Sequence, residues 1–529
     1  MMPDNQNDQK FKVLLVYPDI PGQWVPPVTI GIFTSLLKKA GFEVDLFDAT
    51  FYLEDESSLE VEKRVESGQV RKFSYETAIG VKLKSNLIEG FLEKIDSFRP
   101  DLLMVSAVEG ALKRTLSLLD AANAKNIPHI VGGVFVTAVP EIAIAYSQIK
   151  AICVGEGENA VLEVAKRLRD GSSIDDVPNL WIKKEDGRII KNPLGPLVDI
   201  NEILPDYSLF EKTRFYRPMG GKILRTIPLE TSRGCPFTCT YCNSPMWTKL
   251  YRNNCQSVFV RRKRIDRVIE EMQYLVEKYK PELLYIIDDC FLARPEEEFN
   301  EFVSRYKEIN LPFFIITRIE YITEERIKQL KEINCYRISV GIECGNEEFR
   351  KTKLKRYMTN EKLLKHMKIL GQGGVPFSIN NIIGFPDETR DLIFDTIELN
   401  RQVSGYDTLT VSIFTPYHGT ELREDAIQKG YLDPETPVIH TRESSLLRMK
   451  QLTVQQIDGL MRTFVMYVRF PKEWWPHIKI AEEFTEEGNR MFAKLSKMHS
   501  EIFLSVDQSN KITREPDWDQ LEKQLFYGE

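Results

Sequence analysis

The chain has 529 residues, of which 42% are hydrophobic and 28% are charged, and its formal net charge is −7. This length and composition predict a soluble globular protein of two or three domains. The acidic balance argues against a broad nucleic-acid-binding surface, and no apolar run approaches the ~20 residues that span a bilayer. Eight cysteines and a polar N-terminus without a signal-peptide core favour the cytoplasm, where thiols stay reduced.

Residues 1–170 alternate between short apolar segments and amphipathic segments. Strands are expected at residues 11–17, 43–47, 101–106, 128–131 and 151–154, with helices between them. This alternation is typical of a doubly wound parallel sheet, so the first domain is predicted to be a Rossmann-like α/β domain. Residues 51–100 form a charged insertion in it, with a helix expected near residues 87–98.

Glycines and polar residues stand at the expected carboxyl ends of these strands, namely Ser106, Gly132, Gly133, Gly155 and Glu156. Ligands of doubly wound sheets bind at this edge, where glycine lets a ligand approach the backbone. The first strand–helix loop lacks the pattern G-x-G-x-x-G, so a dinucleotide site is a poor match. Because glycines alone are a weak signal, a domain that binds nothing is the alternative.

Residues 171–222 are polar and are expected to connect two domains, with a hairpin around Asp186 and Gly187. Six strand–helix units follow in residues 223–440. Their strands are expected near residues 226–231, 282–287, 313–317, 336–341, 377–383 and 408–413. Six such units predict a partial (β/α)6 barrel with its active end at the carboxyl ends of the strands. Residues 441–529 read as a mostly helical C-terminal domain that caps the barrel opening.

Three cysteines, Cys235, Cys239 and Cys242, follow the first barrel strand with the spacing C-x-x-x-C-x-x-C. Iron–sulfur clusters are held by thiolates, and three from one loop can bind three corners of a [4Fe–4S] cube. The fourth iron is then open to a small molecule. A structural zinc site is the alternative, but such sites close with a fourth Cys or His at a matching spacing, and the other cysteines are scattered singly.

With Tyr241 as its aromatic residue, this loop resembles the C-x-x-x-C-x-aromatic-C signature of radical S-adenosylmethionine (SAM) enzymes. The resemblance implies that the three cysteines carry the cluster and that SAM chelates the fourth iron through its amino and carboxylate groups. Electron transfer from the cluster would cleave SAM to methionine and a 5′-deoxyadenosyl radical, with Tyr241 against the adenine. It also implies an electron donor of the flavodoxin or ferredoxin type.

Further SAM contacts are expected where the other barrel strands end. The resemblance assigns the SAM amino group to Asp288 and Asp289, the ribose hydroxyls to Glu343, the carboxylate to Arg356, and the adenine to Ile383 and Gly384. Taken singly, each acid is more commonly a helix cap, but acids recur here at successive strand ends. Tyr417 and His418, after the sixth strand, are candidates for substrate binding or proton transfer, and a structural turn explains them equally well.

The first domain resembles the cobalamin-binding domain that is found fused to radical SAM domains. The matching stretches are residues 12–16, 131–140 and 154–158. The resemblance implies that the nucleotide tail of cobalamin lies along the five strand-end residues named above. Many such domains supply a histidine to cobalt through D-x-H-x-x-G, but residues 19–24 contain no histidine. Cobalamin is therefore expected without a histidine ligand, with Gln23 or Trp24 beneath the cobalt.

Together the two resemblances imply a cobalamin-dependent radical SAM enzyme. The function expected first is a methyltransferase that moves a methyl group from SAM, through methylcobalamin, to an unactivated carbon of a small molecule or natural product. The alternative is anaerobic ring formation or rearrangement with the same cofactors and without methyl transfer. An RNA methylthiotransferase would need three more cysteines in the first domain, where only Cys153 is present. A cobalamin carrier without catalysis would leave the cysteine loop unexplained. The residues do not name the substrate.

Overall fold

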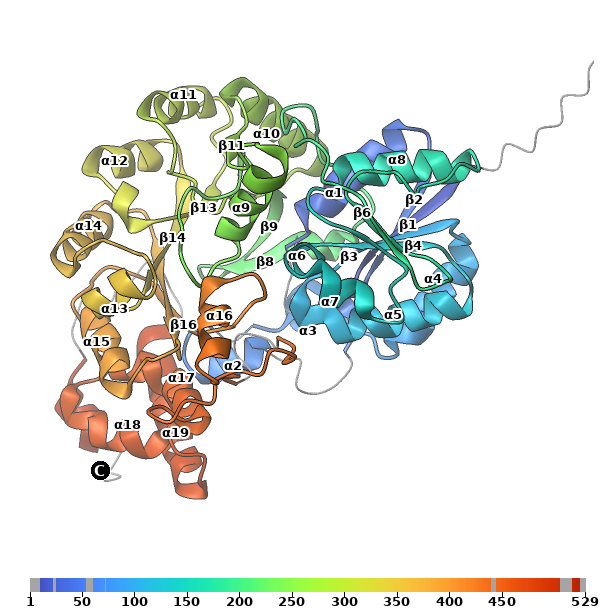
Figure 1. Cartoon of the computed structure of the whole chain (residues 1–529). Coiled ribbons are helices and arrows are strands. Elements are labelled where there is room, and N and C mark those ends of the chain that lie inside the picture. The colour runs from blue at the N-terminus through green and yellow to red at the C-terminus, as the bar shows by residue number, and fades with distance from the viewer. Residues whose placement is uncertain are drawn as a thin grey trace, which may run out of the picture. The chain divides into compact units, whose positions relative to one another are not determined.

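The computed structural model describes residues 10–21, 25–53, 60–71, 73–438, 444–504 and 516–523. Across these ranges the chain forms two compact units, each built on a seven-stranded sheet (Figure 1). The first unit comprises Met1–Ser58, Val81–Phe215 and Met246–Arg264. The second comprises Leu59–Gly80, Tyr216–Pro245 and Ile265–Glu529.

The sheet of the first unit has the strand order β2-β1-β3-β4-β5-β6-β7. Its strands are β1 (Lys12–Tyr17), β2 (Glu43–Asp48), β3 (Leu102–Ser106), β4 (His129–Gly132), β5 (Ala151–Cys153), β6 (Leu180–Lys183) and β7 (Ile189–Lys191). The first five are parallel, which confirms the predicted doubly wound sheet. The strand order reverses between β1 and β3, and ligands of such sheets bind at this switch point. The hairpin predicted around Asp186 is β6 and β7, which extend the sheet in antiparallel fashion.

Helices cover both faces of this sheet because successive strand residues point to opposite sides. Helices α1 (Val28–Lys39) and α8 (Glu158–Arg169) pack against each other on one face. Helices α4 (Leu87–Phe98) and α5 (Leu112–Ala124) pack on the other (Figure 1). The second face has a continuous apolar core that includes Leu14, Leu103, Val131, Phe91 and Leu118. Each fully buried side chain of this kind contributes roughly 1.5–3 kcal/mol to the stability of the fold.

The sheet of the second unit has the order β16-β15-β14-β13-β12-β9-β8. Its strands are β8 (Tyr216–Met219), β9 (Lys222–Leu229), β12 (Leu283–Ile286), β13 (Phe313–Thr317), β14 (Cys335–Glu343), β15 (Phe377–Ile383) and β16 (Thr408–Ile413). The six strands from β9 to β16 are parallel and are the six that the sequence predicted, while β8 pairs antiparallel with β9. This arrangement confirms a partial (β/α)6 barrel.

Helices alternate with these strands and cover the outside of the curled sheet (Figure 1). They are α10 (Ile265–Tyr279), α11 (Glu296–Tyr306), α12 (Glu324–Glu332), α13 (Glu347–Thr352), α14 (Asn360–Gln372) and α15 (Arg390–Arg401). Helix α10 illustrates why they form. Its predicted apolar face, with Val268, Ile269, Met272 and Leu275, is buried, and charged residues occupy the opposite side.

The last strand of the second sheet is closed by segments distant in sequence. Helix α17 (Val454–Arg469) begins at a capping box formed by Thr453 and Gln456 and packs along β16 and α15. Gln69, which follows α2 (Glu60–Glu66), accepts a hydrogen bond from the Val411 N–H of β16 at 3.1 Å. An unpaired strand edge is thereby covered. In the ranges described, none of the helices combines the length and apolarity that a membrane span requires.

Candidate functional site

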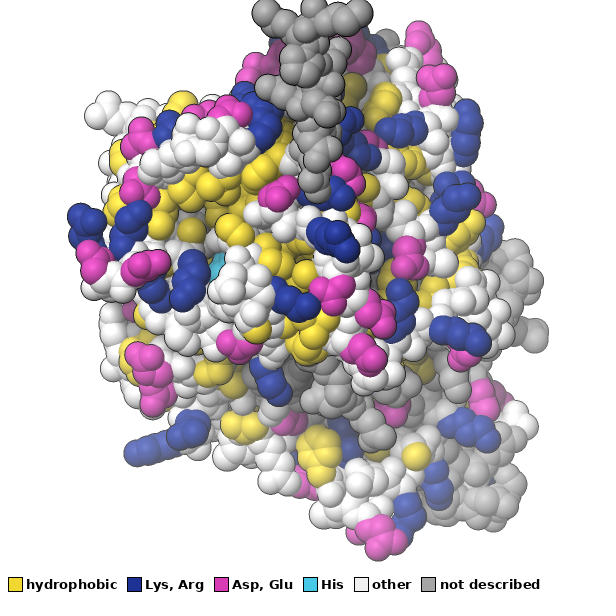
Figure 2. Space-filling model, turned by 90° about the vertical axis from the view of Figure 1, so that its right-hand side faces the viewer, with side chains coloured by type: hydrophobic (Ala, Val, Ile, Leu, Met, Phe, Trp, Pro, Cys, Tyr) yellow, Lys and Arg dark blue, Asp and Glu magenta, His cyan; other side chains and the backbone are white. Residues whose placement is uncertain are grey.

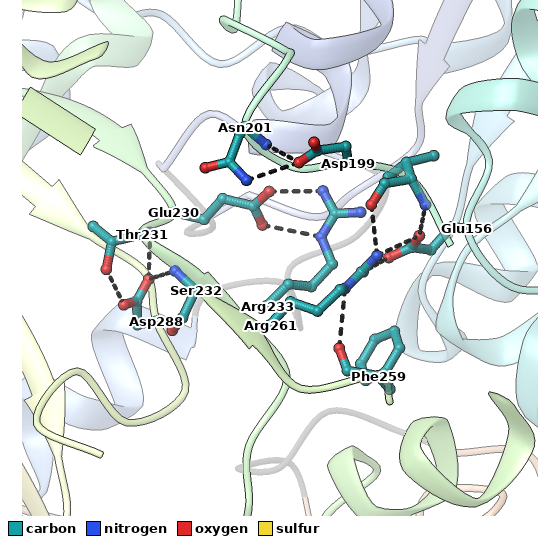
Figure 3. Close-up of polar contacts among 11 residues, drawn as sticks. Glu156, Asp199, Asn201, Glu230, Thr231, Ser232, Arg233, Phe259, Arg261 and Asp288 are labelled. Atoms are coloured by element: carbon teal, nitrogen blue, oxygen red, sulfur yellow. Dashed lines mark hydrogen bonds and ion pairs between the residues drawn. The ribbon is translucent and has the colours of Figure 1, made fainter. Parts of the chain in front are cut away.

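The cysteine loop, residues 230–243, begins at the carboxyl end of β9 and is held there by Asp288. Oδ1 of Asp288 accepts the N–H groups of Thr231 and Ser232 at 2.7 and 3.0 Å. Oδ2 accepts the Thr231 hydroxyl (Figure 3). It also accepts a hydrogen bond from Nη2 of Arg294 at 3.2 Å. Two hydrogen bonds on each oxygen fill the acceptor capacity of a carboxylate. In this structure Asp288 therefore positions the loop. Asp289 is the member of the acidic pair whose carboxylate can still accept a hydrogen bond from a ligand.

The three thiols lie among donors from neighbouring segments. Ser244 donates its N–H to Sγ of Cys242 at 3.4 Å, and its hydroxyl accepts the Cys235 N–H at 3.0 Å and donates to Asp289 at 3.2 Å. Nη1 of Arg318, directly after β13, lies 3.5 Å from Sγ of Cys239. Donors directed at sulfur stabilise negative charge there, so these contacts fit thiolates that hold a cluster.

Burial raises the pKa of the Cys235 thiol to about 12 and that of the Cys242 thiol to about 11. A bound metal reverses this preference, because a coordinating thiol is deprotonated outright. Across the described ranges, no three His, Cys, Asp or Glu side chains converge on a single metal ion. A [4Fe–4S] cube differs from a single ion, since each thiolate binds its own iron. The donor set of this loop fits the cube.

A cavity of 320 Å³ opens beside Tyr241 at the carboxyl end of the barrel strands. It is lined by Glu343 at the end of β14, Asn380 and Asn381 in β15, Thr410 and Ser412 in β16, and Tyr417. The cavity thus brings together three residues that the sequence singled out, Tyr241, Glu343 and Tyr417. Amide, hydroxyl and carboxylate groups around such a cavity suit the hydroxyls and base of a nucleoside.

Glu343 is directed back over the sheet by its backbone. Its φ of +66° is left-handed, a conformation that residues other than glycine adopt at some energetic cost. A Cβ placed on Gly341 would lie 1.9 Å from Oε1 of Glu343, so any larger residue would displace this carboxylate from its observed position. Arg356 donates to Glu343 at 3.5 Å, to the Tyr241 hydroxyl at 3.0 Å and to the Gly341 carbonyl at 2.6 Å. Burial raises the pKa of Glu343, and Arg356 and Arg318 oppose the rise.

The segment after β15 differs by one residue from the expectation. Ile383 is fully buried in the core, and the neighbouring Ile382 lines the cavity instead. Side chains alternate along a strand, so a shift of one residue exchanges core for cavity. Gly384, with a φ of +84°, begins the turn that brings the Phe385 ring to 5.8 Å from the Tyr241 ring.

The buried carboxyl group of Glu388 holds this turn in place. Its Oε2 accepts the N–H groups of Gly384 and Phe385 at 2.5 and 3.1 Å, and Oε1 has no protein partner among the described residues. Burial raises the pKa of Glu388 from its ordinary 4.5 to about 8, and the two N–H groups oppose the rise. At neutral pH the group is therefore mainly protonated.

The stabilities of wild type and the Glu388→Gln variant should diverge as the pH rises. The folded chain binds the Glu388 proton more tightly than the unfolded chain, so wild-type stability falls between about pH 4.5 and pH 8. Glutamine does not titrate. Urea unfolding at several pH values should show wild type losing on the order of 2–4 kcal/mol relative to the variant across that window. A difference that stays constant with pH would contradict the assignment.

Several residues of the site are not marked by any motif in the sequence. The position of Arg318 directly after a buried strand marks it in the sequence as a strand-end group, like Asp288 and Glu343. Asn380 and Thr410 are not marked in this way, since they lie inside strands and meet only across the sheet, where the Thr410 hydroxyl donates to Asn380 Oδ1 at 2.7 Å. His418 does not line the cavity. Its carbonyl accepts a hydrogen bond from Asn243 of the cysteine loop at 2.7 Å.

In the first unit, the strand-end residues Ser106, Gly132 and Gly133 come together where β3 and β4 end. The Ala107 N–H donates to the Gly132 carbonyl at 2.9 Å. A Cβ on Gly133 would lie 2.0 Å from the Ala107 carbonyl oxygen, and its φ is +124°. A Cβ on Gly132 would meet no atom closer than 3.9 Å. Gly133 is thus required by the fold, whereas a Cβ on Gly132 would make only ordinary van der Waals contact, with Cys153.

Gly155 and Glu156, at the end of β5, contact the protein itself. The Tyr251 hydroxyl of α9 (Ser244–Cys255) accepts the Glu156 N–H at 2.7 Å and would lie 2.5 Å from a Cβ on Gly155. The Glu156 carboxylate accepts the Val198 N–H at 3.0 Å and pairs with Arg261 (Figure 3). The predicted residues beneath cobalt, Gln23 and Trp24, lie outside the described residues.

Comparison with known proteins decides the family. Residues 229–399 match the radical SAM superfamily, and residues 21–165 match the B12 binding domain. The chain belongs to the B12-binding radical SAM enzymes. The two matched domains account for its cofactors, which are a [4Fe–4S] cluster and SAM in the first match and cobalamin in the second. The cysteine loop and the cavity both lie in the radical SAM domain or directly beyond it.

Individual relatives agree with this membership. An uncharacterized methyltransferase of Pyrococcus horikoshii is 27% identical over 72% of this chain and 81% of its own. The anaerobic magnesium-protoporphyrin IX monomethyl ester cyclase of Rubrivivax gelatinosus is 23% identical over 78% of this chain and 70% of its own. The solved structure of the cobalamin-dependent SAM radical enzyme OxsB, with aqua-cobalamin and SAM bound, has the same fold. It covers 98% of this chain and 75% of its own with a TM-score of 0.63 and 15% identity.

Proposed function

We propose that this B12-binding radical SAM enzyme is a methyltransferase that moves a methyl group from SAM to an unactivated carbon of a small molecule. The observation that carries the proposal is the cysteine loop beside a polar cavity, in a chain that also has a B12-binding domain. The similarity to the Pyrococcus horikoshii methyltransferase supports methyl transfer as the outcome. When bound, the cluster and SAM supply the radical chemistry and cobalamin carries the methyl group.

We assign the residues of the second unit as follows. Cys235, Cys239 and Cys242 hold three irons, and Ser244 and Arg318 stabilise the negative charge on sulfur. Glu343 accepts the ribose hydroxyls of SAM, while Arg356 holds Glu343 and the Tyr241 ring in place. Asp289 receives the SAM amino group. Tyr417, which lines the cavity, binds the substrate or transfers a proton.

In the first unit we assign the strand-end residues Ser106, Gly132 and Gly133 to the nucleotide tail of cobalamin. Gly132→Ala should leave the fold intact, because its Cβ would make only ordinary contact with Cys153. It should weaken cobalamin binding, because the added methyl group keeps the tail from approaching the backbone closely. Gly133→Ala should instead destabilise the unit by about 3 kcal/mol or more, because its Cβ would meet the Ala107 carbonyl. Thermal unfolding and an absorbance titration with cobalamin separate the two effects. A stable Gly132→Ala protein with unchanged affinity would place cobalamin elsewhere.

The reaction also needs electrons and a reducing environment. We propose that a flavodoxin or ferredoxin in the cytoplasm supplies them. All eight cysteines are free thiols in the structure, which fits a reducing compartment.

The second candidate function is anaerobic ring formation, favoured by the similarity to the Rubrivivax gelatinosus cyclase. The fate of a labelled methyl group distinguishes the two. The reconstituted protein is incubated without oxygen with SAM labelled in its methyl carbon, cobalamin, a reductant and candidate substrates. Methyl transfer predicts label on protein-bound cobalamin and then on the product carbon. Deoxyadenosine formation with an unlabelled product and unlabelled cobalamin would replace the proposal by the cyclase alternative.

A further inference from the structure

A strongly basic segment borders the cysteine loop. Residues 351–368, KTKLKRYMTNEKLLKHMK, contain six lysines and one arginine against a single glutamate. Their formal charge is +6, from seven positive side chains and one negative, in a chain whose total is −7. Lys353, Lys355 and Arg356 form ion pairs with carboxylates outside the segment, so its outward positive charge comes from the other lysines. Lys351, Lys362, Lys365 and Lys368 are exposed. By contrast, acidic and basic side chains are interspersed over the face shown in Figure 2. We refer to residues 351–368 as the basic segment.

The basic segment contacts the cysteine loop directly through Lys353 and Arg356, and a cavity of 330 Å³ is lined by residues of both. Lys355, Tyr357 and Lys362 line it on one side, and Phe237 and Thr238 of the loop line it on the other. Tyr357, one of its lining residues, is 66% exposed. Aromatic residues of this kind are enriched in protein interfaces.

One side chain that lines this cavity also contacts a cysteine sulfur. Arg318 lines the cavity, its guanidinium carbon lies 3.8 Å from the centre of the Phe237 ring, and its Nη1 lies 3.5 Å from Sγ of Cys239. The guanidinium of one side chain therefore reaches from the cavity to that sulfur. This cavity is distinct from the 320 Å³ cavity assigned to SAM, and the two share no lining residue.

We propose that the basic segment and the 330 Å³ cavity form the docking surface for an acidic one-electron carrier protein. The inference rests on the proposed function, because only a cluster on this loop requires reduction. One electron leaves the reduced carrier and enters the oxidised cluster, and no atom is transferred. Positive charge around the entry attracts an acidic carrier from a distance and orients it. Redox encounters use small interfaces, so a short segment with one exposed aromatic residue is sufficient.

The surface can be mapped without relying on turnover. The full-length protein is mixed with a flavodoxin of net negative charge and treated with a zero-length reagent that joins lysines to carboxylates. Mass spectrometry should locate the crosslinks mainly at Lys351, Lys362 and Lys365. The affinity of the same pair should fall steeply as salt is added, because the attraction is between exposed charges. Crosslinks concentrated on other lysines would overturn the proposal.

A charge-reversal variant gives a second, independent readout. Lys351→Glu, Lys362→Glu and Lys365→Glu together should raise the Kd for flavodoxin about tenfold or more at low salt. The matched control reverses three other exposed lysines, Lys113, Lys307 and Lys494, which lie on other elements. It changes the net charge equally and should alter the Kd by less than about twofold. Equal weakening in both variants would show a dependence on net charge alone and refute a local surface.

Comparing two reductants distinguishes a docking role of the basic segment from its other possible roles. Deoxyadenosine formation by the charge-reversal variant should fall about tenfold with flavodoxin and stay at the wild-type rate with dithionite, which needs no docking surface. An equal fall with both reductants would assign the basic segment to an anionic substrate or a nucleic acid instead. If wild type transfers no label from SAM with either reductant while crosslinking persists, the proposed function fails and the docking surface stands.

Discussion

Replacing Cys239 by alanine should abolish the cluster and with it all cleavage of SAM. Cys239 is the most deeply buried thiol of the loop, and Arg318 donates toward its sulfur. Without it, two irons of the cube lack a protein ligand, so the cube should not survive reconstitution. Iron and sulfide content, visible absorbance and deoxyadenosine formation measure the loss, which should reach background. Cys235→Ala and Cys242→Ala should behave in the same way.

Cys255→Ala is the matched control for this experiment. Cys255 ends α9 and is partly exposed like Cys235 and Cys242, but its sulfur lies near the carbonyls of Leu194 and Gly195 within the first unit. Its replacement should leave iron content and SAM cleavage unchanged. A Cys239→Ala protein that kept its iron and its activity would show that the cysteine loop does not carry the cluster.

Replacing Glu343 by glutamine should lower the rate of SAM cleavage about 10- to 100-fold while the cluster remains intact. A hydrogen bond to a charged group is worth about 1.5–3 kcal/mol, and glutamine keeps the shape of the side chain but removes its charge. The variant also leaves Arg356 without its buried counter-ion. Deoxyadenosine formation and SAM affinity are measured on protein with wild-type iron content.

Glu332→Gln provides the comparison, because Glu332 is an exposed residue at the end of α12. It should leave SAM affinity and cleavage unaltered. Wild-type kinetics in Glu343→Gln would remove Glu343 from the SAM site and leave its left-handed backbone and its pairing with Arg356 without a functional role.

Local patterns were sufficient for most of the fold. The parallel strands and the helices between them follow from apolar runs and helical periodicity, which depend only on neighbouring residues. Helix α10 and the hairpin around Asp186 are examples. The cysteine loop was equally accessible, because its three thiols lie within eight residues and their spacing carries the chemistry.

The contacts that complete the site depend on residues far apart in sequence. Asp288 binds Thr231 across 57 residues, and Arg356 binds Tyr241 across 115. The sequence also does not show which of two neighbouring strand residues faces the cavity, as Ile382 and Ile383 illustrate. The basic segment was not recognised, because its charges look like an ordinary solvated helix until the structure places the 330 Å³ cavity and the cysteine loop beside it.

The central claim is that the loop holds a cluster with one iron open to SAM. Electron paramagnetic resonance of the reduced, anaerobically reconstituted protein tests it most directly, with spectra recorded before and after SAM is added. We expect a [4Fe–4S] signal whose shape changes when SAM binds the open iron, and no such signal in Cys239→Ala. A cluster spectrum that SAM leaves unchanged would contradict the account.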